Sequence, residues 1–200
     1  MAEALEVLQK YWNYANFRND QNKVIQQLIS GGDVIALLPT GGGKSICYQV
    51  PAMLYEGMTI VVSPLIALME DQVEQLRSRG ISAERLHSGL TQQNIGRILD
   101  NALMGEVKML YVAPERLLQD QFLGICKQLN IDLLAIDEAH CISQWGHDFR
   151  PSYLQISEFI SELSAPQVIA VTATATERVI EEIQEHLSIC LLYTSPSPRD

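Results

Sequence analysis

The sequence has no pair of cysteines spaced as in a metal knuckle or a redox motif. Its four cysteines, Cys47, Cys126, Cys141 and Cys190, are well separated, and no C-x-x-C occurs. This spacing excludes a zinc knuckle and a thioredoxin-like redox site within these 200 residues. We expect isolated thiols that pack as small apolar side chains.

Long apolar runs are missing as well. No stretch approaches the ~20 apolar residues that a membrane-spanning helix needs, and the acidic segment 1–6 lacks the apolar core of a signal peptide. With 47% hydrophobic and 19% charged residues, the chain has the composition of a globular protein with one domain. These features predict a cytoplasmic protein without membrane association.

Positive charge is scarce. The chain has 14 Lys and Arg residues against 24 Asp and Glu residues, which gives a net charge of −10. A nucleic-acid-binding protein usually carries a broad basic face, and this balance argues against one. A local basic groove on an acidic body is still compatible with the composition. Composition alone therefore indicates no more than an α/β enzyme of the cytosol.

Short apolar runs alternate with helix-like stretches along most of the chain. Runs buried on both faces and joined by helical crossovers are typical of a doubly wound, mostly parallel sheet with helices on both faces. Such sheets bind ligands at the carboxyl ends of their strands. The predicted strands are 33–39, 58–64, 82–88, 108–114, 131–137 and 167–173, and the predicted helices are 44–55, 65–79, 92–105, 115–130, 152–163 and 176–187.

The final residues, 190–200, do not fit this pattern. They read CLLYTSPSPRD, with two Ser-Pro steps after a finished helix, which is compatible with a linker to a following domain. The string also matches, residue for residue, the in-frame translation of a transposon-end adaptor used in sequencing libraries. We therefore predict a domain over 1–189 and a non-native read-through tail over 190–200 that has no packed role.

A glycine-rich turn separates the first predicted strand from the helix after it. Glycines let backbone N–H groups turn inward around an anion, and the next helix N-terminus adds partial positive charge. A lysine and a hydroxyl at its end suit the phosphates and the Mg²⁺ of a bound nucleotide. Leu38 stands where the G-x-x-x-x-G-K-[ST] pattern has glycine, but three glycines remain for the turn. The candidate phosphate-binding residues are Thr40, Gly41, Gly42, Gly43, Lys44 and Ser45.

An acidic pair ends the predicted strand 131–137. Asp137 is suited to hold Mg²⁺ through its waters. Glu138 can orient and polarise an attacking water molecule. His140, two residues further on, could sense the terminal phosphate. A capping acidic turn is the alternative for this motif alone, but the phosphate loop at Lys44 favours nucleotide hydrolysis.

Several longer segments resemble the RecQ helicases of superfamily 2. The segment 137–153 reads DEAHCISQWGHDFRPSY and matches the family's D-E-A-H motif and the aromatic-rich loop after it. The segment 17–21 matches the F-R-x-x-Q adenine motif, and 63–69, 71–73, 111–117 and 171–175 match further motifs in the expected order. The resemblance covers 8–187. One departure is Asn13, where the family's pattern has glycine.

This resemblance implies a RecA-like P-loop NTPase domain of an ATP-dependent DNA helicase that moves 3′ to 5′. The implied cofactors are ATP and Mg²⁺, and the implied partner is single-stranded or partly duplex DNA, at the nucleoid if the source is bacterial. A second RecA-like domain and a four-cysteine zinc module would lie beyond 189. An RNA helicase is a rival interpretation that 141–153 argue against. A fragment that binds nucleotide and DNA with negligible turnover is a second rival.

The resemblance also implies residue roles. Gln21 would read the adenine edge through its amide, and the flat guanidinium of Arg18 would stack on the ring; both could instead be ordinary surface residues. The loop after the acidic pair would stack on unpaired bases, or it could plug the domain's own core; its candidate residues are Trp145, His147, Phe149 and Arg150. Short polar side chains at strand ends would bind DNA phosphates without adding charge, or could serve as caps or buried hydroxyls; these are Ser63, Gln72, Ser88, Thr172 and Thr174.

Overall fold

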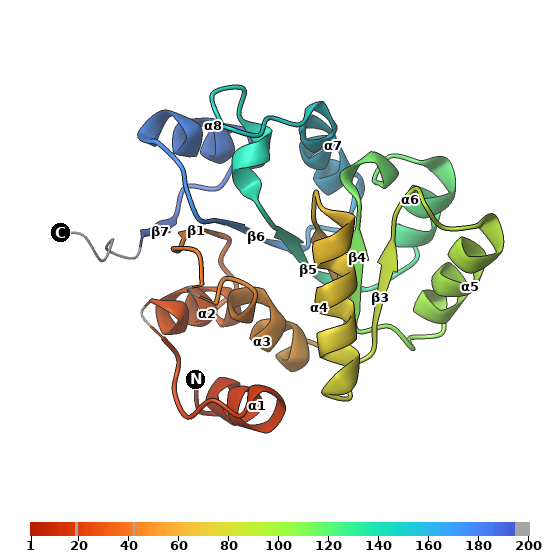
Figure 1. Cartoon of the computed structure of the whole chain (residues 1–200), viewed down its shortest axis with the longest axis horizontal. Coiled ribbons are helices and arrows are strands. Elements are labelled where there is room, and N and C mark those ends of the chain that lie inside the picture. The colour runs from red at the N-terminus through yellow and green to blue at the C-terminus, as the bar shows by residue number, and fades with distance from the viewer. Residues whose placement is uncertain (19, 42, 195–200) are drawn as a thin grey trace.

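All strands in the described part of the chain join one parallel sheet. The computed structural model describes residues 1–18, 20–41 and 43–194. Its seven strands run in the order β3-β4-β2-β5-β6-β1-β7, and every neighbouring pair is parallel (Figure 1). The strands are β1 Val34–Leu37, β2 Met58–Val62, β3 Ala83–Leu86, β4 Met109–Val112, β5 Ile131–Ile136, β6 Gln167–Thr172 and β7 Leu192–Thr194.

Helices cover both faces of the sheet. Helices α1 to α4 pack on one face and α5 to α8 on the other (Figure 1). In the described part of the chain, none of these helices is both long and apolar enough to cross a membrane. The helices are α1 Ala2–Trp12, α2 Gln21–Ile29, α3 Ile46–Leu54, α4 Ile66–Ser78, α5 Gln92–Leu103, α6 Asp120–Cys126, α7 Gln155–Glu162 and α8 Glu177–Leu187, and the 3-10 helices are η1 Pro114–Arg116, η2 Ala139–Ile142 and η3 Pro151–Leu154.

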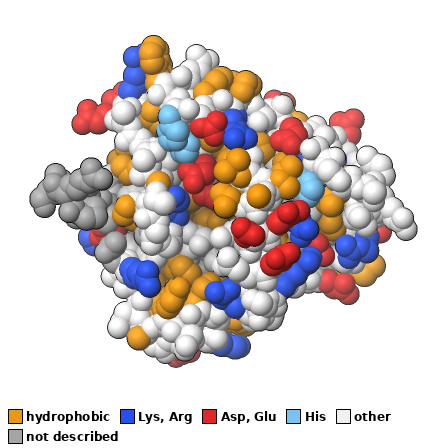
Figure 2. Space-filling view, viewed as in Figure 1, with side chains coloured by type: hydrophobic (Ala, Val, Ile, Leu, Met, Phe, Trp, Pro, Cys, Tyr) orange, Lys and Arg blue, Asp and Glu red, His pale blue; other side chains and the backbone are white. Residues whose placement is uncertain are grey.

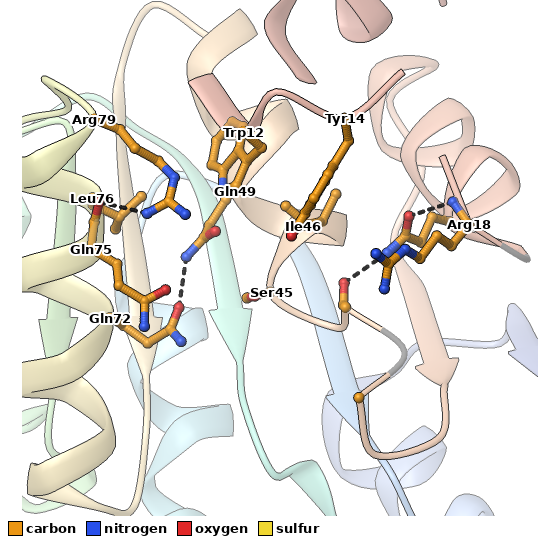
Figure 3. A pocket seen from close by; sticks show the side chains of 13 residues that line it. Trp12, Tyr14, Arg18, Ser45, Ile46, Gln49, Gln72, Gln75, Leu76 and Arg79 are labelled. Carbon is orange, nitrogen blue, oxygen red and sulfur yellow. Dashed lines mark hydrogen bonds between the residues drawn. The ribbon is translucent and has the colours of Figure 1, made fainter. Parts of the chain in front are cut away.

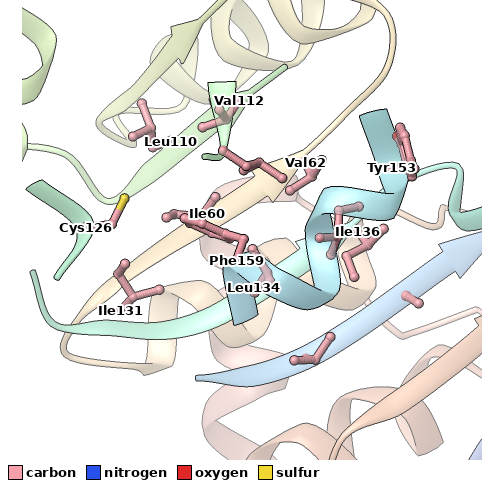
Figure 4. Close-up of a cluster of buried hydrophobic side chains, with 14 of the residues drawn as sticks. Ile60, Val62, Leu110, Val112, Cys126, Ile131, Leu134, Ile136, Tyr153 and Phe159 are labelled. Carbon is pink, nitrogen blue, oxygen red and sulfur yellow. The ribbon is translucent and has the colours of Figure 1, made fainter. Parts of the chain in front are cut away.

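Alternation along the central strands divides the core into two layers. In β2, Ile60 and Val62 face α5 to α8, whereas Val61 faces α1 to α4. Phe159 of α7 packs over the first of these layers with Ile60 and Leu134 (Figure 4). Truncating Ile60 or Leu134 to alanine should lower the free energy of unfolding by about 2–5 kcal/mol. The loops at the carboxyl edge of the sheet therefore start from a closely packed core.

The predicted fold class is confirmed, but the predicted helix over 115–130 is wrong. The chain instead forms η1, a turn and the short helix α6. Leu117 is fully buried in the core, and Gln119 adopts an extended backbone (φ −70°, ψ 129°) before α6 begins. Burying Leu117 turns the chain away from a single helical axis, so tertiary packing overrides the helical pattern.

The tail forms an edge strand, so the predicted lack of any packed role is wrong for 192–194. Strand β7 pairs with the free edge of β1, and the Ile35 N–H donates to the Leu191 carbonyl oxygen at 2.9 Å. Leu192 and Tyr193 are half-buried and pack against opposite layers of the core. An unpaired strand edge accepts a segment rich in β-forming residues through its backbone. Residues 195–200 lie outside the described part of the chain, and the adaptor origin stays a prediction.

Candidate nucleotide site and the loop beside it

The phosphate loop connects β1 to α3. Gly41 and Gly43 have φ values of 78° and 71°, a region that L side chains rarely adopt. Leu38, which stands where the general pattern has glycine, is buried in the core under α1 to α4 and takes no part in the turn. Thr40 is exposed, and Gly42 lies outside the described residues. The turn therefore depends on the later glycines, as the sequence predicts.

Gln21 ties this loop to the start of α2. Its side chain is buried, its Nε2 donates to the Gly43 carbonyl oxygen at 3.0 Å, and its Oε1 accepts from the Arg18 N–H at 2.8 Å. A Cβ atom at Gly43 would collide with the Gln21 amide. The predicted contact between Gln21 and adenine stays a prediction, and in this structure the amide holds two backbone segments together.

A cavity of about 160 Å³ lies between α1, α2 and α4 (Figure 3). The Arg18 guanidinium lies 5.2 Å from the Tyr14 ring centroid, and both side chains are exposed at its rim. Flat groups of this kind at a cavity rim suit contact with a purine ring. Sequence reasoning missed Tyr14. The turn that presents it is made by Asn13, whose φ of 58° caps α1. Asparagine tolerates this left-handed conformation, so it can replace the family's glycine.

A second cavity, of about 300 Å³, continues from the first toward the acidic pair. Gly41, Gly43, Ser45 and Gln72 line both cavities. The Lys44 Nζ lies in this second cavity, 3.7 Å from the Glu138 Oε1. One groove therefore leads from the flat groups at Tyr14 to the carboxylates.

The acidic pair sits in a strained turn at the end of β5. Glu138 adopts φ 48° and ψ 48°, which is uncommon for a residue with a side chain. The Glu138 N–H donates to the Asp137 Oδ1 at 3.0 Å, and the Tyr153 hydroxyl donates to the Asp137 carbonyl oxygen at 2.8 Å. Strain of this kind persists only where surrounding contacts hold it, and it concentrates at functional sites.

Electrostatics at this turn favour a bound cation. Burial, followed by the neighbouring Glu138 carboxylate, raises the pKa of Asp137 to about 6. A divalent cation would favour the ionised form. Ser45 and Asp137 line the same cavity, and a hydroxyl with a carboxylate gives the hard oxygen donors that Mg²⁺ prefers. The residues present therefore fit Mg²⁺.

His140 links the acidic pair to the end of β6. Its Nδ1 lies 2.8 Å from the Thr172 Oγ1 and 3.3 Å from the Glu138 Oε2. Because the Thr172 hydroxyl donates to the Thr174 carbonyl oxygen, it accepts from His140, which assigns the proton to Nδ1. Burial lowers the pKa of His140, which favours the neutral form of the ring. Thr172 is fully buried, so in this structure it connects His140 to β6 and is not open to DNA.

The loop 141–150 folds back against His140. The His147 ring stacks on the His140 ring with centroids 4.3 Å apart and planes 18° apart. The Arg150 Nη1 donates to the Pro64 carbonyl oxygen at 2.9 Å, which attaches the loop to the end of β2. Trp145 is 60% exposed, so it does not plug the core. Phe149 is half-buried.

The other polar candidates occupy different environments. Ser88 and Thr174 are exposed at strand ends, whereas Ser63 is buried. Gln72 accepts from the Gln49 Nε2 at 2.9 Å on the wall of the nucleotide groove, a position that favours nucleotide over DNA. Their DNA contacts stay predictions. On the face that Figure 2 shows, Lys and Arg side chains are interspersed with Asp and Glu side chains.

Comparison with known proteins agrees with this geometry. The family model described as "DEAD/DEAH box helicase" matches residues 18–183, and the chain belongs to this family. The ATP-dependent DNA helicase RecQ of Bacillus subtilis is 46% identical over 188 residues, which is 93% of this chain and 32% of that protein. RecQ of Haemophilus influenzae is 41% identical over 93% of this chain and 30% of its own length.

The chain thus spans about a third of the length of these curated relatives. A solved structure titled "DEAD-box helicase Mss116 bound to ssRNA and UDP-BeF" superposes with a TM-score of 0.76 at 16% identity, covering 99% of this chain and 44% of that one. At that identity the likeness shows the fold alone. The RecA-like fold implied by the sequence is confirmed.

Proposed function

We propose that this chain is the first motor domain of an ATP-dependent 3′-to-5′ DNA helicase of the RecQ type, with the domain over 1–189 and a non-native tail over 190–200. The main support is the groove that leads from Tyr14 and Arg18 through the phosphate loop to the acidic pair. The identity to RecQ proteins supports DNA as the track. The proposed place of action is the cytoplasm, at the nucleoid if the source is bacterial.

The residues of the groove divide the work of ATP hydrolysis. Tyr14 and Arg18 would hold the adenine, and Lys44 would contact the β- and γ-phosphates together with backbone N–H groups of the loop. Glu138 would orient the attacking water and accept its proton. Ser45 and Asp137 would hold Mg²⁺, which neutralises charge on the phosphates when it is bound.

The loop 141–150 would connect this chemistry to DNA. His147 contacts His140 directly, and His140 contacts Glu138 and Thr172. A base that stacks on Trp145 could therefore shift groups that touch the nucleotide. By reciprocity, DNA would tighten ATP binding by the same factor by which ATP tightens DNA binding.

A second candidate function is nucleotide and DNA binding with negligible turnover by the isolated chain. Lys44 and Glu138 line one cavity of this domain, 3.7 Å apart, so they could bind a nucleotide without further chains. The RecQ resemblance implies that a second motor domain supplies an arginine finger, a group worth ~10³–10⁵ in rate in GTPases. We expect that domain, and a zinc module, in the full-length parent.

Nucleotide binding by the isolated chain tests the site. A fluorescent ATP analogue with Mg²⁺ should bind the unaltered chain weakly, and Lys44→Ala should abolish binding because it removes the charge facing the phosphates. Glu138→Gln should keep binding, since the amide retains the size of the side chain, and should remove residual hydrolysis because an amide cannot act as a base. Hydrolysis by Glu138→Gln at the unaltered rate would refute the assigned role.

A further inference from the structure

Arg178 lies over the exposed tryptophan of the loop. It is the second residue of α8, and its guanidinium carbon is 3.5 Å from the centroid of the Trp145 ring. At that distance the planar cation is in contact with the face of the indole. The two residues are 33 positions apart in the sequence, so no local sequence pattern predicts their contact.

The local environment of Arg178 does not explain where its side chain goes. A cation in the first turn of a helix opposes the partial positive charge of the helix N-terminus. Glu181 and Glu182 stand three and four positions further along α8, where a partner could stabilise it. Among the described residues, however, Arg178 forms no ion pair within 4.0 Å. The ring of Trp145 is the group that the guanidinium contacts.

The contact leaves much of the indole open. Trp145 is 60% exposed, and its backbone N–H donates to the Ser143 Oγ at 3.1 Å. An open cavity of about 430 Å³ lies beside the ring, with His147, Thr174 and Thr176 among its lining residues. An aromatic ring that is fixed on one face and open on the other is a platform on which an unpaired base can stack.

We propose that Arg178 is a positioning residue that fixes the Trp145 ring for stacking on an unpaired base of single-stranded DNA. The inference rests on the proposed function, because it needs Trp145 to contact DNA. A free tryptophan side chain would lose rotamer freedom on binding a base. The guanidinium removes that loss beforehand by holding the ring in one orientation.

The size of the effect follows from the strength of an exposed cation–π contact. Losing it should weaken binding of single-stranded DNA about two- to fivefold. Arg178→Gln removes the charge and the planar guanidinium but keeps a polar side chain of moderate length. Arg178→Lys keeps the charge, but an ammonium cannot stack as a plane. Its dissociation constant for single-stranded DNA should therefore lie between those of the unaltered chain and Arg178→Gln.

Two fluorescence measurements on the 200-residue chain test the proposal. All variants carry Trp12→Phe, which leaves Trp145 as the single tryptophan, since the sequence has two. Acrylamide quenching without DNA reports how much of the Trp145 ring is covered. Anisotropy of fluorescein-labelled dT15 gives the dissociation constant. Lys127→Gln is the control, because it removes an exposed cation that pairs with Glu162 away from the loop.

The expected result is a joint change. Arg178→Gln should raise both the quenching constant and the dT15 dissociation constant, Arg178→Lys should restore part of each, and Lys127→Gln should change neither. Unchanged quenching, or increased quenching with equal or tighter dT15 binding, would overturn the proposal. A Trp145→Ala chain that binds dT15 as tightly as the unaltered chain, or an unaltered chain that does not bind dT15, would instead refute the DNA role in the proposed function.

Discussion

Gly146 is the residue at which one added methyl group tests the loop most sharply. A Cβ atom there would lie 2.5 Å from the His140 carbonyl oxygen and 3.2 Å from the Ser143 carbonyl oxygen. Ordinary contact begins at 3.4 Å, so the Gly146→Ala loop must move about 0.9 Å away from His140. The movement would pull His147 off the His140 ring and shift Trp145 relative to Arg178.

The structure predicts unequal effects of this variant on stability and function. Overpacking in a core lowers the free energy of unfolding by about 1–3 kcal/mol. Because Trp145 and His147 are exposed, this loop can move, and Gly146→Ala should lower that free energy by no more than about 1 kcal/mol. Misplacement by roughly 1 Å can cost on the order of 100-fold in a catalytic step. We expect at least a tenfold loss of the DNA-stimulated part of ATPase activity in a two-domain protein carrying this motor domain.

The assay combines thermal melting with ATPase rates measured with and without dT15. Gly96→Ala is the matched control, because Gly96 lies inside α5 and a Cβ there meets nothing within 4 Å. It should raise the free energy of unfolding by about 0.5–1 kcal/mol and leave the DNA response intact. Full DNA stimulation in a stable Gly146→Ala protein would show that the packing of the loop on His140 does not matter for coupling.

Three further perturbations have defined outcomes. Asp137→Asn in metal-free buffer should raise the free energy of unfolding above pH 6 by an amount on the order of 1–3 kcal/mol, which thermal melting would measure. The raised pKa means that the carboxyl destabilises the fold as pH rises from 3.8 through about 6, so the gain should vanish near pH 4; a gain independent of pH contradicts this. Tyr153→Phe removes the hydrogen bond to the Asp137 carbonyl and should lower the free energy of unfolding by about 1 kcal/mol. It should also slow hydrolysis while nucleotide still binds; an unchanged rate would show that the conformation of Glu138 does not depend on Tyr153. Deleting 190–200 removes β7 and should lower the melting temperature by a few degrees, and an unchanged value would show that this edge strand adds no stability.

The sequence predicted the phosphate loop and the acidic pair because parallel strands determine where their ends meet. Lys44 follows β1 and Glu138 follows β5, and the sheet brings these carboxyl ends to one edge. Residue chemistry and the order of strands and motifs were therefore enough to predict that these two side chains lie close together. The same reasoning located the loop at Trp145 beside His140, because the two are close in the chain.

Contacts between distant segments could not be predicted in this way. The stacking of Arg178 on Trp145 and the hydrogen bond from Tyr153 to Asp137 have no periodic signal. Pairing of β7 with β1 depends on the open edge of β1 and on backbone groups that any extended segment offers. Leu117 broke the predicted helix because its burial depends on the completed core.

The most direct test of the account is the ATPase rate of a two-domain protein carrying this motor domain, measured with and without single-stranded DNA. Trp145→Ala and Phe149→Ala should leave the DNA-independent rate nearly intact and remove most of the stimulation, whereas Lys44→Ala should remove both activities. Loop variants that stay folded and keep full stimulation by DNA would contradict the coupling of this loop to the nucleotide site.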